Sequence, residues 1–193
     1  MNDSKTLSLD QFKEKIKQII TKEVPLRDPA IAVVHIPKES YSLCLQNLIL
    51  NLKQLRENFS EWTYKLFNSE EILFSLLGKG GYTEDENFAL KCQRNLLKKD
   101  LETNIRKSFL SAVENEISDV KSLINADSSI PPPLLILLNI HSCYHYIQTK
   151  HVVAQIVNQK GVYVLIIYPQ LYNKSTFYKE ANYNVEPIFL TSY

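Results

Sequence analysis

Two continuous apolar runs near the C-terminal end of the chain constrain its fold more than any other feature. The runs are LLILLNI at 134–140 and VYVLIIY at 162–168, and neither alternates apolar with polar residues. Strands that are apolar on both faces are typical of parallel sheets covered by helices on two sides. Between the runs, residues 149–158 carry branched apolar side chains at helical spacing. The segment therefore predicts a compact unit of strand, helix and parallel strand.

The rest of the chain supplies further elements of the same kind. Ser8 and Gln11 form a capping-box pattern that predicts a helix ending before Pro25. The other predicted elements are strands at 30–36, 62–67 and 186–192, and helices at 39–59, 69–77, 83–99 and 100–124. We therefore expect one domain over residues 1–193, a three-layer α/β fold with a mostly parallel central sheet of about four to five strands. A helix-rich middle would be inserted at about 84–124, and the C-terminal tail would add edge strands.

The charge balance and the cysteines limit the possible partners and the compartment. The chain has 22 basic and 21 acidic residues, a net charge of +1, which argues against direct DNA binding and attraction to an anionic membrane. Its polar start is unlike a signal peptide, and no apolar run approaches the roughly 20 residues of a membrane span. Three cysteines without CxxC spacing suit a reducing compartment. We expect a cytoplasmic protein.

One loop carries residue types that bind metals. His141, Cys143 and His145 stand two residues apart just after a predicted strand, and His151 follows closely. A second histidine or cysteine pair is missing, and a nucleophilic role for Cys143 lacks an oxyanion hole and an orienting acid. We therefore predict no catalytic residue, no metal and no cofactor. The alternative is a small enzyme, or a nucleotide- or metal-binding protein, that uses residues 141–151 at the carboxyl edge of the sheet.

Two other motifs have simpler explanations. The GKGG motif at 78–81 lacks the Lys-Ser/Thr ending of a phosphate loop and follows a helix, so we interpret Gly78 as a helix C-cap. A modest basic cluster, formed by Lys98, Lys99, Arg106 and Lys107, is diluted by nearby acidic residues. This pattern favours a solvated helix face over a nucleic-acid patch.

Apolar residues outside the predicted core are candidates for partner binding. Leu43 and Leu50 point away from the core stripe of the helix at 39–59, so either the later helices or a partner would cover them. Tyrosines crowd the C-terminal quarter, where they serve either an edge strand or an interface. The predicted partner-binding residues are Leu43, Leu50, Tyr168, Tyr172, Tyr178 and Tyr183. A homodimer is a further alternative.

The C-terminal third resembles the BrxB family, the small B component of BREX bacteriophage-defence systems. The resemblance lies in LLILLNI (134–140), HSCYHYIQTKHVVAQI (141–156), VLIIYPQ (164–170) and NYNVEPIFL (182–190). The preceding order of elements is also similar. The sequence departs from the family pattern at three places: Gln148 replaces an arginine, Gln170 replaces a glycine, and residues 183–185 replace a Tyr-Tyr-Arg sequence. A site shared by the family would be altered at these positions.

The resemblance implies a function that the residues alone do not. BrxB proteins have no known enzyme activity and act with other defence proteins in the cytoplasm. Those proteins include the phosphatase-like PglZ, a DNA methyltransferase and a large ATPase. The resemblance thus implies a non-enzymatic adaptor in a phage-restriction complex, bound to a larger partner such as PglZ.

Overall fold

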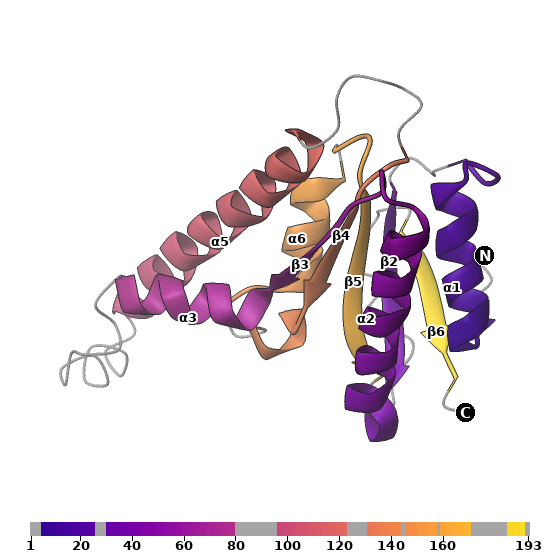
Figure 1. Cartoon of the computed structure of the whole chain (residues 1–193). Helices are drawn as coiled ribbons and strands as arrows, with labels where there is room; N and C mark the ends of the chain where they lie inside the picture. The colour runs from indigo at the N-terminus through magenta and orange to yellow at the C-terminus, as the bar shows by residue number, and fades with distance from the viewer. Residues whose placement is uncertain are drawn as a thin grey trace.

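The chain folds into one parallel sheet with helices on both faces (Figure 1). The computed structural model describes residues 5–25, 30–79, 96–122, 131–143, 146–157, 159–170 and 185–191, with only the backbone of residues 5, 79 and 96–101. The strands are β1 (Lys5–Leu7), β2 (Ile31–Pro37), β3 (Tyr64–Asn68), β4 (Leu134–Leu138), β5 (Tyr163–Gln170) and β6 (Glu186–Leu190). The helices are α1 (Leu9–Ile20), α2 (Tyr41–Asn58), α3 (Ser69–Lys79), α5 (Leu96–Ser122) and α6 (Thr149–Ile156), with 3-10 turns η1 (Lys38–Ser40) and η2 (Ile140–Cys143).

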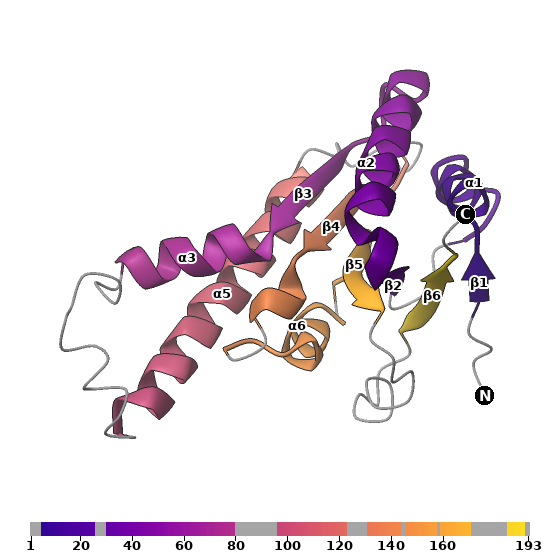
Figure 2. The same ribbon diagram turned by 90° about the horizontal axis from the view of Figure 1, so that it is seen from below.

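Each face of the sheet is buried under its own layer of helices. Helices α1 and α2 cover one face, whereas α3, α5 and α6 pack with the other, an arrangement that Figure 2 shows from below. The alternation along β2 shows why its sequence is apolar throughout. Val34 packs with α1 and α2, and its neighbour Val33 packs with the opposite layer. The continuous apolar runs therefore indicated burial on both faces correctly.

The six strands are all parallel and lie in the order β1-β6-β2-β5-β4-β3. Two features of this order differ from the prediction. Strand β6 was expected at an edge but lies between β1 and β2. Strand β1 was not predicted, because its three residues are too few to show a period. Pairing of Thr6 with Phe189 and Leu7 with Leu190 adds this sixth strand at the edge beyond β6.

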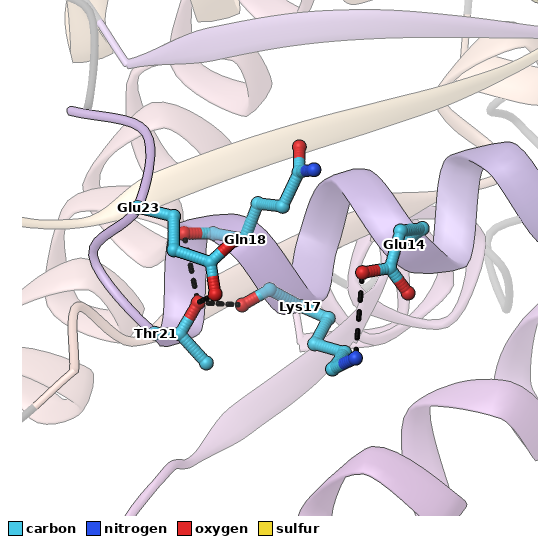
Figure 3. A network of polar contacts seen from close by, with 5 residues as sticks. All are labelled: Glu14, Lys17, Gln18, Thr21 and Glu23. Atoms are coloured by element: carbon cyan, nitrogen blue, oxygen red, sulfur yellow. Dashed lines mark hydrogen bonds and ion pairs between the residues drawn. The ribbon is translucent and has the colours of Figure 1, made fainter.

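Helix α1 begins and ends as its sequence specifies. Ser8 and Gln11 form the predicted capping box, and the apolar residues of the helix are buried. At the other end the Thr21 hydroxyl lies 3.1 Å from the Lys17 carbonyl oxygen and 3.0 Å from Glu23 Oε1, while Lys17 pairs with Glu14 (Figure 3). The helix therefore ends at a polar network before Pro25.

The middle of the chain shows one correction and one long helix. Gly78 lies inside α3, which continues to Lys79, so it is not the predicted C-cap. The helix predicted at 100–124 is α5, whose buried stripe comprises Ile105, Phe109, Val113, Ile117 and Val120. Residues 80–95, which include the second half of the GKGG motif and the start of the predicted insertion, lie outside the described residues. None of the described helices combines the length and the apolar composition that crossing a bilayer requires.

Candidate functional site

The carboxyl edge of the sheet is the best-defined candidate site. Because every strand runs the same way, β2, β3, β4 and β5 all end at this edge. The chain leaves β2 through η1 into α2 on one face, and leaves β4 through η2 into α6 on the other. Strand β5 lies between these two strands. Open α/β sheets bind ligands at such a point, where connections depart to opposite faces.

Five rings from five elements meet at this edge, and we call them the ring cluster. They are Tyr41 of α2, His141 of η2, Tyr168 of β5, His35 of β2 and Phe189 of β6. The His141 ring stands edge-on to Tyr41 at 5.8 Å and to Tyr168 at 5.7 Å, between ring centroids. His35 stacks on Phe189 at 4.7 Å and lies 6.3 Å from Tyr168. The cluster therefore continues across the carboxyl ends of β6, β2 and β5.

The imidazoles of the ring cluster are neutral near pH 7. Burial lowers the pKa of His35 to about 4. Burial also lowers the pKa of His141, against the opposing effect of the Glu70 carboxylate. In the same environment burial raises the pKa of the Tyr41 hydroxyl. The cluster thus offers hydrogen-bonding atoms without formal charge, and Glu70 is a nearby acidic group.

Several buried polar atoms at this edge have no hydrogen-bond partner among the described residues. They are Tyr41 Oη, His141 Nδ1, Ser69 Oγ and Thr149 Oγ1. Ser69 begins α3 and Thr149 begins α6, and both helices start at the carboxyl edge. Most buried polar atoms in proteins are paired, so a concentration of unpaired ones marks a place where another polar group can bind.

Hydrogen bonds fix the turn that carries His141. Asn139 adopts a left-handed conformation with φ of 56°, which asparagine tolerates better than most residues. Its side-chain Nδ2 donates to Asn68 Oδ1 at 3.2 Å, and Asn68 Nδ2 donates to Glu71 Oε1 at 2.8 Å. These bonds join the residue before η2 to the end of β3 and the start of α3, close in sequence to His141 and Glu70.

Of the three candidate metal ligands, only His141 and Cys143 lie among the described residues. His141 and Cys143 share η2, but the Cys143 side chain is buried in the core between the sheet and α6, and its Sγ faces the Asn139 carbonyl at 3.9 Å. His145 lies outside the described residues. His151 Nδ1 accepts a 3.4 Å hydrogen bond from the Gln148 N–H at the start of α6. In the described part of the chain, no three metal-binding side chains are grouped for an ion.

The predicted partner-binding residues differ in accessibility. Leu43 and Leu50 are 57% and 53% exposed on the outer side of α2, and the later helices lie on the opposite face of the sheet instead of covering them. Tyr168 is only 7% exposed, within the ring cluster. The other candidates, Tyr172, Tyr178 and Tyr183, lie outside the described residues.

The sequence prediction placed its candidate loop at this edge of the sheet but did not include the other residues of the ring cluster. It placed a candidate loop after β4, which contains His141, and missed the contributions of β2 and α2. Listing the side chains at the end of each predicted parallel strand and just after it would have added His35, Tyr41 and Glu70. Comparison of the chain with protein-family models, with curated proteins and with solved structures finds no match.

Proposed function

We propose that the protein is a non-enzymatic adaptor of a BREX-type bacteriophage-defence complex, in which it binds a larger partner such as a PglZ-like phosphatase-fold protein. The proposal rests on the resemblance of the C-terminal third to the BrxB family. The order of elements supports it, since a helix, a strand ending at Pro37, a long helix and a strand precede the C-terminal unit. The methyltransferase and the large ATPase of such systems are the other expected partners.

The observation that carries an adaptor role is the exposed apolar pair on α2. Leu43 and Leu50 lie two helical turns apart, so their side chains project from the same side of the helix. The buried residues of the helix, Cys44, Leu48, Leu52 and Leu55, occupy the opposite side. Gln46 is exposed and Asn47 half-buried between the leucines, so two amide side chains border the pair. An apolar stripe bordered by amides is suited to contact with another protein surface.

The chemistry of Cys143 favours an adaptor over a cysteine-dependent enzyme. Burial is the main cause that raises the pKa of the Cys143 thiol to about 11, and the Glu70 carboxylate makes a smaller contribution in the same direction. The thiolate is the nucleophilic form of cysteine, and a raised pKa leaves very little of it at neutral pH. His151, the nearest predicted base along the described chain, is engaged by the Gln148 N–H.

Co-purification tests the adaptor proposal directly. The tagged wild-type protein should retain a defence protein encoded beside it, and the double variant Leu43→Asp/Leu50→Asp should lose that protein. The matched control is Phe74→Asp, because Phe74 is also an exposed apolar residue, 60% accessible, but lies on α3. Thermal unfolding of each variant should stay within a few degrees of the wild type, since all three side chains are exposed.

Two results would contradict the proposal. The first is that the wild type retains no defence protein and that deletion of the gene leaves phage resistance intact. The second is that the Phe74 and leucine variants lose the partner equally, because the loss would then not depend on the α2 surface.

A further inference from the structure

The ring cluster contains a pair of polar atoms that the adaptor function does not use. Tyr41 Oη and His141 Nδ1 are both buried and both without a hydrogen-bond partner among the described residues. Their rings are in edge-on contact, with centroids 5.8 Å apart. The contact joins the start of α2, on one face of the sheet, to η2, which leads to the other face.

The Tyr41 ring contacts the His141 ring, but neither Tyr41 Oη nor His141 Nδ1 gains a hydrogen bond from this contact. Tyr41 is half-buried at the first residue of α2, and Ser40, the N-cap residue, makes no side-chain capping bond there. A buried hydroxyl without a hydrogen-bond partner costs free energy, so it destabilises the position of the Tyr41 ring. A ring with hydrogen-bonding atoms on its edge could fill the same place against His141 and supply the bond that the phenol does not.

We propose that an uncharged nucleoside-like molecule, a planar heterocycle with polar edge atoms, binds His141 by displacing the Tyr41 ring at the carboxyl edge of the sheet. Tyr168 contacts the His141 ring from another element, with centroids 5.7 Å apart, and forms a further aromatic wall. Aromatic walls favour planar ligands through stacked or edge-on contacts.

The charges at this edge favour the neutral nucleoside over its phosphate. The Glu70 carboxylate is close enough to act on the titration of both His141 and Cys143. It would repel an anionic ligand. Burial keeps His141 predominantly neutral at pH 7, so its imidazole supplies a hydrogen bond without a compensating positive charge. Adenosine should therefore bind at least as tightly as AMP.

Isothermal titration with adenosine should rank three variants, two at Tyr41 and one at His141, in a defined order of affinity. Tyr41→Ala removes the displaced ring and should tighten binding roughly tenfold. Tyr41→Phe removes only the unsatisfied hydroxyl, so the ring should stay in place more firmly and binding should weaken a few-fold. His141→Phe keeps an aromatic ring but removes Nδ1, and binding should be lost.

Controls separate this proposal from a general effect on the sheet. Tyr64→Ala removes a half-buried tyrosine at the start of β3, at the opposite edge, and should leave adenosine affinity unchanged. Ribose and AMP serve as further probes with the wild type. The proposal is overturned if adenosine does not bind at millimolar concentration. Water would then be the only partner left for Tyr41 Oη and His141 Nδ1. The proposal is also overturned if AMP or ribose binds tighter than adenosine, or if Tyr41→Ala weakens binding while remaining folded.

Discussion

At the scale of single residues, burial favours the neutral forms of two histidines and one cysteine at the carboxyl edge. His35 belongs to β2, whereas His141 and Cys143 belong to η2, and burial is the largest cause of the pKa shift for each of them. Desolvation disfavours the charged form, so it lowers the pKa of a histidine and raises that of a cysteine. The sequence prediction identified His141 and Cys143 by type, but not their state, because burial depends on what the rest of the chain packs against them.

The raised pKa of Cys143 should make its thiol slow to react. A shift from 9.0 to about 11 lowers the thiolate fraction at pH 8 by about 100-fold relative to an unperturbed thiol. Alkylation with iodoacetamide, followed by peptide mapping, should therefore label Cys143 about 100-fold more slowly in the folded protein than in urea. Labelling at equal rates would show that the thiol is exposed or ionised in the native state.

His35 should make the protein less stable in acid. Its pKa is about 4 in the folded protein and 6.5 unperturbed, so its contribution is fully present above pH 6.5 and is lost as the pH falls towards 4. The full shift corresponds to about 3 kcal/mol of unfolding free energy. Urea unfolding of wild type and His35→Phe at pH 7 and pH 4 measures it. The variant should lose less stability between the two pH values, whereas parallel losses would exclude His35 as the cause.

At the scale of elements, local patterns were sufficient where an element has its own signal. The capping box of α1 and the apolar stripe of α5 identified both helices, and the start of α1 was placed correctly at Ser8. Strand β1 has three residues, and it pairs with β6 from the far end of the sequence. Such a strand is defined by its partner, so its own residues could not reveal it.

The ion pair between α1 and β6 should stabilise the contact of the N-terminal helix with the sheet. Lys15 Nζ lies 2.6 Å from Glu186 Oε1, and the two side chains are 22% and 9% exposed. Glu186→Gln removes a charged, half-buried interaction and should lower the unfolding free energy by about 1–3 kcal/mol in urea denaturation. The matched control is Lys17→Met, which breaks the exposed Lys17–Glu14 pair and should change stability by less than about 1 kcal/mol. Equal effects would show that the Glu186 pair gains nothing from its burial.

At the scale of the whole molecule, the fold class was predictable and the strand order was not. The apolar runs at β4 and β5 indicated a parallel sheet between helices, and these two strands are parallel neighbours. The position of β6 depends on pairing with β1 and β2, which are far away in the sequence. A Tyr- and Asn-rich approach to the last strand indicated an edge, but long-range pairing places β6 inside the sheet.

Amide hydrogen exchange should report this strand order across the whole sheet. Strands β2 and β5 have parallel neighbours on both sides and side chains buried on both faces, so their amides should exchange most slowly. The described edge strands, β1 and β3, should exchange first, and β6 should be more protected than β3 because it is paired on both sides. Mass spectrometry of peptides covering residues 64–68 and 186–190 compares two strands of equal length. Equal or faster exchange in β6 would place it at an edge, as the sequence alone had predicted, and would contradict the observed order.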